Sequence, residues 1–122
     1  MDKKQWKTKI KSAAKKAGTY QPFFDAVIDT LAGILEKRDT AQEVFDRSGG
    51  NVVIAHTNKG GATNLELNPA LRLINDLNRD ALAYWRDLGL TPAGLKRINE
   101  AAMQKKEKGS ALEEALKSIG GA

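Results

Sequence analysis

The sequence predicts a mainly α-helical fold: a small helical bundle with an N-terminal basic helix, a long central helix and one β-hairpin insertion. Apolar residues recur at three- and four-residue spacing through most of the 122 residues, which is the period of a helix with one buried face. Asn68-Pro69 and Thr91-Pro92 each mark a helix start, because a capping side chain precedes a proline at the first helical position. One segment, residues 52–67, pairs with itself across a Gly-rich turn and predicts the hairpin.

Length and composition limit the class of protein. The chain is long enough for one domain with a modest core. It contains no cysteine, which excludes disulfides and thiolate metal sites and fits a reducing cytoplasm. The sequence shows no apolar run long enough to span a bilayer and no secretory signal.

The net charge of +5 is concentrated at one end of the chain. Residues 1–18 carry seven lysines and one acid, a balance of +6, whereas the remainder has 13 basic and 14 acidic residues, a balance of −1. A basic segment on a near-neutral body indicates a polyanionic partner, most often nucleic acid.

Residues 1–18 predict a basic helix that binds DNA phosphates. Trp6, Ile10 and three alanines form its apolar stripe, and Gly18 ends it. Lysine suits phosphates, whereas base reading favours arginine, and no arginine precedes Arg38. A solvated tail helix and a membrane-surface helix are the alternatives, although a mostly alanine stripe suits a membrane poorly. The candidate DNA-binding residues of this helix are Lys3, Lys4, Lys7, Lys9, Lys11, Lys15 and Lys16.

A long central helix is predicted over residues 20–47. Its apolar residues follow alternating gaps of four and three, a heptad pattern with Arg38 as the one polar break. Further apolar residues widen the stripe beyond what one partner needs in so small a domain, although a core helix of a small bundle is the alternative. We therefore expect this helix to pack both on its own chain and on a neighbouring subunit. The candidate oligomerisation residues, two of them from the helix after the hairpin, are Tyr20, Phe24, Val27, Leu31, Ile34, Ala41, Phe45, Leu73 and Trp85.

The hairpin is expected to lie with its apolar face on the helical core. The predicted turn is Asn58-Lys59-Gly60-Gly61, and the predicted facing pairs are Val52–Leu67, Ile54–Leu65 and His56–Thr63. The loop does not match a phosphate-binding loop, because its lysine precedes the glycines and extended residues flank it. His56 has no cysteine or metal-ligand set around it in the sequence, so we interpret it as an ordinary strand histidine. Lys59 at the tip is a supporting candidate for a contact with DNA or with a neighbouring subunit.

The helix that begins at Pro69 ends near Gly89, and the next helix begins at Pro92, so the pair resembles a helix-turn-helix. Lys96 and Arg97, near the start of the second helix, are candidate DNA-reading residues. Helical bundles turn in this way routinely, so the pattern is unspecific. It leaves open an alternative function, a small dimeric helix-turn-helix-like DNA-binding regulator.

Residues 104–122 are predicted to hold a polar linker, Lys105–Gly109, and a short helix that a capping box opens at Ser110. The apolar residues of this short helix dock a partner, as in an adaptor, or pack on the chain's own domain. They are Leu112, Leu116 and Ile119. The predicted organisation is a basic arm at 1–18, a helical core and oligomerisation region at 19–103 with hairpin 52–67, and this tail at 104–122.

The residues give no sign of catalysis. The carboxylates are scattered over the polar faces of helices, and no cluster suggests a two-metal nuclease. We predict that the protein is not an enzyme and that it binds no cofactor and no metal.

Two stretches, "GTYQPFFDAVIDTLAGILEKRD" at 18–39 and "NPALRLINDLNRDALAYWRDLGLTPAGLKRIN" at 68–99, carry a family resemblance. A tyrosine-led helix, an Asn-Pro helix and then "LGLTP", in this order, resemble the small subunits of tailed-bacteriophage terminases. The resemblance implies a non-catalytic DNA-recognition subunit for viral genome packaging. It implies that such subunits form a ring, bind double-stranded DNA and deliver it to the large subunit with the ATPase and nuclease. The implied location is the cytoplasm of the infected bacterial host, with no membrane partner.

Overall fold

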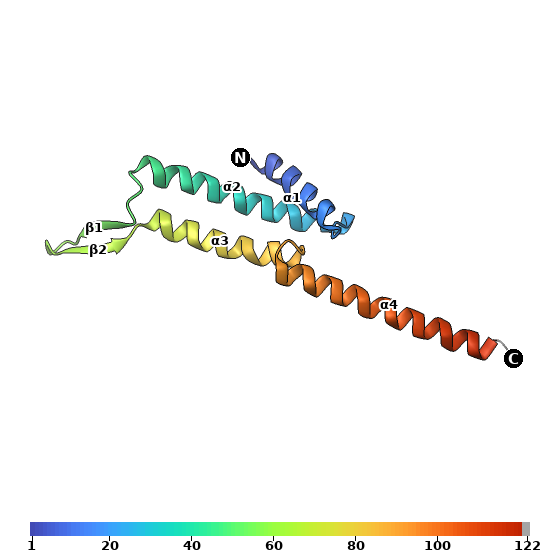
Figure 1. The fold of residues 1–122 in the computed structure, drawn as a ribbon. Helices are drawn as coiled ribbons and strands as arrows, with labels where there is room; N and C mark the ends of the chain where they lie inside the picture. Colours follow the sequence, from blue (N-terminus) through green and yellow to red (C-terminus); the bar gives the residue numbers. More distant parts are fainter. Residues whose placement is uncertain (121–122) are drawn as a thin grey trace.

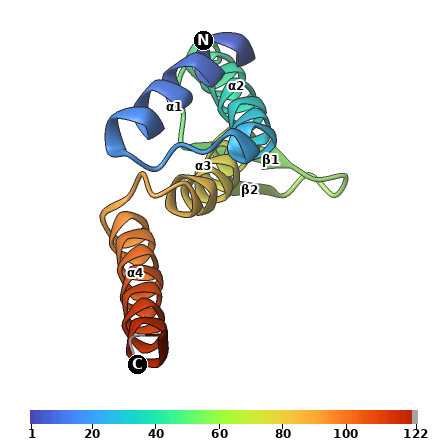
Figure 2. The same cartoon turned by 90° about the vertical axis from the view of Figure 1, so that its right-hand side faces the viewer.

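Three helices form the body of the protein, and a hairpin and a fourth helix project from its two ends (Figures 1 and 2). The computed structural model describes residues 1–120. The elements in chain order are α1 (Lys3–Ala17), the 3-10 turn η1 (Pro22–Phe24), α2 (Asp25–Arg47), β1 (Val53–Thr57), β2 (Thr63–Leu67), α3 (Pro69–Asp87) and α4 (Pro92–Gly120). The predicted fold class, mainly helical with one hairpin between the second and third long helices, is confirmed.

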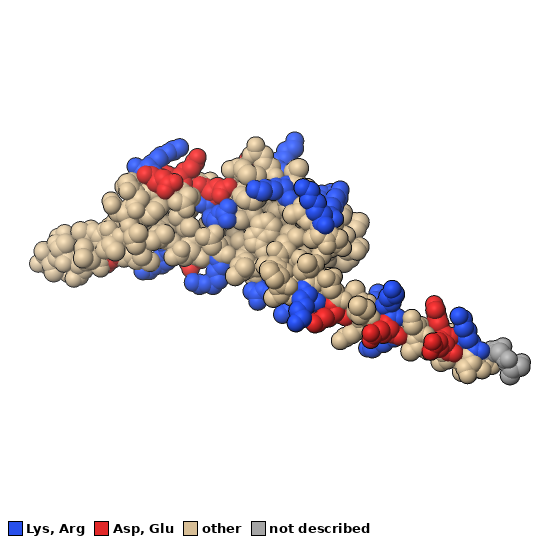
Figure 3. Space-filling view, viewed as in Figure 1, with Lys and Arg blue, Asp and Glu red and all other residues tan. Residues whose placement is uncertain are grey.

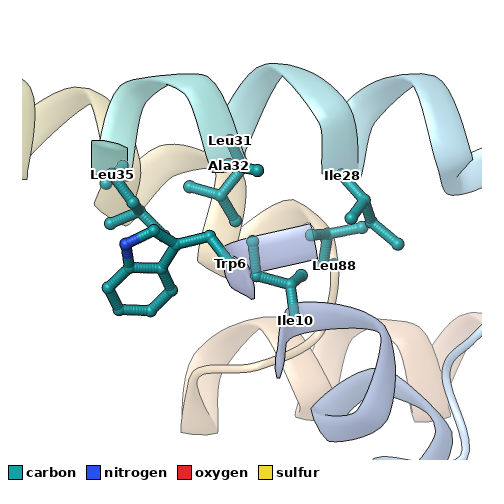
Figure 4. Packing of buried hydrophobic residues seen from close by; sticks show 8 residues of the cluster. Trp6, Ile10, Ile28, Leu31, Ala32, Leu35 and Leu88 are labelled. Atoms are coloured by element: carbon teal, nitrogen blue, oxygen red, sulfur yellow. The ribbon is translucent and has the colours of Figure 1, made fainter. Parts of the chain in front are cut away.

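The core lies on both sides of α2. Trp6 and Ile10 of α1 pack on one side of α2, and Leu88 lies beside them (Figure 4). On its other side, α2 packs against Ala81 of α3 and, near its C-terminal end, against Ile74. The fully buried α2 side chains are Ile28, Leu31, Ala32 and Leu35. Each large apolar side chain buried in this way contributes about 1.5–3 kcal/mol. The wide apolar stripe of α2 is therefore matched by two partners within one chain.

The central helix begins later than residue 20. Gln21 is extended (φ −135°, ψ 142°), as is favoured before a proline, and Pro22 opens the 3-10 turn from which α2 continues. Tyr20 therefore lies before the helix, and its hydroxyl donates a 2.8 Å hydrogen bond to Asp25 Oδ1. The predicted ends at Gly18 and Gly89 are confirmed, because both glycines have left-handed φ, 75° and 73°.

The hairpin has a different register from the predicted one. Its antiparallel pairs are Val53–Leu67, Ile54–Glu66, Ala55–Leu65, His56–Asn64 and Thr57–Thr63. The predicted turn was one residue too short, because the Asn58 side chain accepts hydrogen bonds from the amides of Gly60 and Ala62 at 2.9 and 3.1 Å. Ala62 thereby joins the turn, and every predicted facing pair shifts by one residue. His56 therefore lies opposite Asn64 and not Thr63.

The hairpin does not lie on the helical core, contrary to prediction. Every residue from 51 to 67 is exposed except the half-buried Ile54. The strands leave the body beyond the C-terminal end of α2 (Figure 1). They are attached through Asn68, whose backbone amide donates to the Val52 carbonyl at 2.8 Å and whose side chain donates to the Asn51 carbonyl at 2.9 Å.

The predicted linker and separate short helix are one continuous helix in the structure. α4 runs from Pro92 to Gly120 through the whole polar stretch. Gly109 does not interrupt the helix, because one glycine costs a helix only about 1 kcal/mol and the lysines, glutamates and alanines around it favour helix. From Asn99 to Ile119 every residue of α4 is exposed, so this part projects from the body (Figures 1 and 2).

A tight joint links α3 to α4. The Thr91 hydroxyl caps α4 by accepting a 3.0 Å hydrogen bond from the Gly94 amide. A Cβ at Gly94 would collide with the backbone carbonyl of Arg86, so only glycine fits there. At Gly89 a Cβ would meet Thr19 and Ile98, which places the end of α1 beside the start of α4.

Candidate nucleic-acid interface

The lysine-rich helix α1 is well defined by its ends. Asp2 and Gln5 form a reciprocal capping box, with the Gln5 amide donating to Asp2 Oδ1 at 2.8 Å. Gly18 ends the helix, and its amide donates to the Lys15 carbonyl at 3.1 Å. Lys15 and Lys16 in the last turn interact favourably with the helix dipole.

α1 is docked on α2 by specific polar contacts as well as by its apolar stripe. The Trp6 indole donates to Asp39 Oδ2 at 2.7 Å, and the Lys3 backbone amide donates to Glu36 Oε2 at 2.7 Å. Burial of Asp39 would raise the pKa of this carboxyl, but the indole, the N-terminal ammonium and Arg38 outweigh burial and lower it. The basic helix is thus an integral helix of the bundle.

Three of the seven lysines point toward acids of α2. Lys3 and Lys7 lie 3.0 and 3.2 Å from the Asp29 carboxylate, and their hydrogen bonds lower its pKa. Lys11 lies 3.9 Å from Asp25; the Tyr20 hydroxyl, and then this carboxylate, raise the pKa of Lys11. The pairs are exposed, so each contributes little to stability. Their main effect is to offset charge: two carboxylates face three lysines, so the group carries +1 in place of +3.

The other four lysines are the best candidates for binding phosphates. Within residues 1–120, no carboxylate lies within 4.0 Å of Lys4, Lys9, Lys15 or Lys16. Lys9 Nζ lies 5.1 Å from the centroid of the Trp6 ring, and Lys15 Nζ lies 5.3 Å from that of Tyr20. Such cation–π contacts hold a lysine in place and leave its charge available. Figure 3 shows blue Lys and Arg side chains gathered over the part of the body where α1 lies.

The remaining DNA candidates are spread over the molecule. Lys59 lies at the exposed hairpin tip, at the end opposite to α4 (Figure 1). Lys96 and Arg97 are exposed in the first turns of α4, near the end of α1, and Lys96 lies 4.0 Å from Glu100. The start of α4 lies beside Thr19, just after α1, whereas Lys59 lies at the opposite end of the body.

The α3–α4 pair does not have a helix-turn-helix arrangement. In that motif the two helices cross at about 90–120°. Here α4 continues in nearly the direction of α3 (Figures 1 and 2). The structure therefore gives no support to the dimeric regulator, which depends on a crossing recognition helix.

The candidate oligomerisation residues fall into three groups. Leu31, Ala41 and Phe45 are buried within their own chain, so they have almost no surface for a partner. Leu73 is 51% exposed. The half-buried group that packs against the core is Tyr20, Phe24, Val27, Ile34 and Trp85. The tail residues Leu112, Leu116 and Ile119 are 62%, 60% and 77% exposed.

Sequence reasoning missed the acids that face the lysines and the groove that α2 forms with α3. Asp25 and Asp29 are one helical turn apart, so they form one acidic line toward α1, a spacing visible in the sequence. The groove is lined by acids of α2 and by Leu73 and Leu77 of α3. No pattern within one helix reveals such a groove, because two helices form it.

The described part of the chain also lacks two kinds of feature. No group of three His, Cys, Asp or Glu side chains in residues 1–120 is placed to hold a metal ion. None of the helices in this range has the length and apolarity needed to cross a membrane.

The fold and its charged surface define a small helical protein whose first helix presents four lysines without an acidic partner in residues 1–120. The family model of the phage terminase small subunit matches residues 3–105. This match covers most of the chain, which therefore belongs to the phage terminase small subunit family and has the DNA-packaging role that the family implies. Terminase small subunits are non-catalytic, so the chain is not an enzyme. No curated protein and no solved structure gave a significant match.

Proposed function

We propose that this protein is the DNA-recognition subunit of a phage genome-packaging terminase, acting in the cytoplasm of the infected bacterium. It assembles into a ring, binds double-stranded DNA through α1 and delivers it to the large ATPase and nuclease subunit. The observation that carries the DNA contact is the set of four lysines on α1 that pair with no carboxylate of the described part of the chain, in a family that packages DNA.

The arrangement of α1 favours binding to the DNA backbone over reading of bases. Lysine ammonium groups bind phosphates as point charges, and the 15 residues of α1 span about 22 Å at 1.5 Å per residue. One copy that neutralises up to four phosphates gives a salt dependence of about −3.6 in log K against log salt. Several copies in a ring bind the same DNA multivalently, so affinity increases without a new type of contact.

Two triple variants with the same charge change test this assignment. The test variant replaces Lys4, Lys9 and Lys16 with glutamine, and the control replaces the paired lysines with glutamine: Lys3, Lys7 and Lys11. We expect the test variant to weaken DNA binding strongly and to flatten the salt dependence by about three in the slope for one copy, because three phosphate contacts are lost. The control should change the DNA affinity and the salt dependence much less, since its lysines already have acidic partners.

Fluorescence anisotropy on a DNA duplex at several salt concentrations measures both quantities, with circular dichroism to verify folding. Equal losses in the two variants would show that only the net charge of α1 matters and would refute the special role of the unpaired lysines. No loss in either variant would refute a site on α1. Light scattering tests the ring separately: a monomer at tens of micromolar would exclude it. Co-purification with the large subunit tests delivery.

A further inference from the structure

An open groove of ≈ 860 Å³ lies between the C-terminal half of α2 and the N-terminal half of α3. Its apolar lining includes Val44, 53% exposed, and Leu73, 51% exposed, with Leu77 beside them. Exposed apolar side chains in a groove indicate a site for another apolar surface. In the described chain nothing covers these residues.

The rim of this groove is acidic. It contains five carboxylates, Lys37 and the N-terminal ammonium, which lies 3.2 Å from Asp39, so the rim carries −3. The five acids are Asp2, Glu36, Asp39, Glu43 and Asp46. Figure 3 shows red side chains gathered over this end of α2. An apolar floor with an acidic rim fits a helix that presents apolar and basic side chains on the same face.

The projecting part of α4 has such a face. Leu112, Leu116 and Ile119 follow Lys105 and Lys108 at spacings that place all five on one side of the helix. The acids Glu100, Glu107 and Glu114 recur every seven residues on the opposite side, and Glu113 lies at the border. The face is thus apolar at its C-terminal end and basic one to two turns before it.

The dimensions of the two surfaces agree. From Leu112 to Ile119 the helix rises about 10 Å, and the groove floor on α3, from Ala70 to Leu77, has the same seven-residue length. Tail and groove belong to opposite ends of one chain, because α4 leaves the body away from the groove (Figure 1). A straight α4 therefore reaches the groove of another copy and not its own.

We propose that the α2–α3 groove of one copy binds the 105–119 segment of α4 from a second copy. Leu112, Leu116 and Ile119 lie on the apolar floor, and Lys105 and Lys108 lie against the acidic rim. This contact joins two different surfaces, so it repeats head to tail and closes into a ring when the rotation permits. The inference rests on the self-assembly in the proposed function and specifies the surfaces that carry it.

Two single substitutions test whether the contact is head to tail. Leu73→Asp disables the groove and Leu116→Asp disables the tail, and both side chains are exposed, so the fold of each variant is retained. We expect each variant to be monomeric by light scattering, with its association weakened at least about tenfold. An equimolar mixture should form a 1:1 dimer, because one intact tail then meets one intact groove.

Other outcomes would overturn the proposal. Wild-type assembly by both variants would show that neither surface is used. A monomeric Leu116→Asp variant beside an assembling Leu73→Asp variant would show that α4 pairs with some other surface. In either case the ring and the DNA contact of α1 would stand, whereas a monomeric wild type would exclude the ring itself.

A charge exchange tests the rim. Glu43→Lys with Asp46→Lys, or Lys105→Glu with Lys108→Glu, should each weaken assembly, and the four changes together should restore it. Glu107→Lys with Glu114→Lys, on the opposite face of α4, is the control and should leave assembly unchanged. If the fourfold variant does not recover, the acidic rim does not face these lysines.

Discussion

The docking of α1 on α2 predicts that Ile10→Ala strongly destabilises the protein. Ile10 is 0% exposed and lies in the main core cluster. The substitution removes three carbons at about 0.8 kcal/mol for each buried CH₂ group, and the cavity left behind adds to this cost. We therefore expect a loss of about 3 kcal/mol from a total stability of about 5–15 kcal/mol, and a decrease in Tm of about 10–15 °C.

Thermal unfolding followed by circular dichroism measures the effect, at one protein concentration because assembly changes Tm. Ser12→Ala, on the exposed side of α1, is the control and should shift Tm by no more than about 2 °C. A shift this small for Ile10→Ala would refute the docking and show that residues 1–18 are a detached arm. Deletion of residues 1–17 would expose the face of α2 that packs on α1, so such a deletion is a poor test of DNA binding.

Two further predictions concern glycines and pH. Gly94→Ala should destabilise the α3–α4 joint, because the new Cβ collides with the Arg86 carbonyl. Gly109→Ala has open space around it and should stabilise α4 by up to about 1 kcal/mol. Unfolding curves and helical circular dichroism measure both effects. The pKa values of Asp29 and Asp39 are lowered in the folded state, so both carboxyls contribute stability above their unfolded pKa near 3.9, and this contribution is lost as the pH falls through the folded values. Urea unfolding between pH 7 and pH 2.5 should show this loss, and Asp39→Asn should reduce it; a flat profile would contradict the pairing.

Local signals in the sequence predicted the ends of α1 and α3 and the start of α3, but not the start of α2 or the continuity of α4. Asn68 caps α3 as expected, with its side chain accepting from the Ala70 amide at 3.0 Å. These signals act within one or two turns, so a single sequence contains them. The strand register depended on the side chain of Asn58 in the turn, a contact that alternation of residue types does not reveal. A one-residue error there placed each β1 residue on the wrong face relative to β2.

The sequence predicted that the candidate site is basic, but not which of its lysines face acids. The charge of residues 1–18 correctly indicated a basic surface, but only the packing of α1 shows that Lys3, Lys7 and Lys11 face acids. The wide apolar stripe of α2 is covered by α1 and α3 of the same chain. The sequence alone does not show this, because it does not show that these two helices lie on two sides of α2. The exposed Leu73 and the α4 tail remain as surfaces available to other copies.

The joint at Gly89 and Gly94 also sets the direction in which α4 leaves the body. From Leu95 to Ile119 α4 extends about 36 Å, so a change of 5° at the joint moves the tip by about 3 Å. If tails join neighbouring copies, this short turn determines the angle between them, and the number of subunits follows from that angle. Substitutions beside the joint would then change the size of the ring and leave the docking surfaces intact.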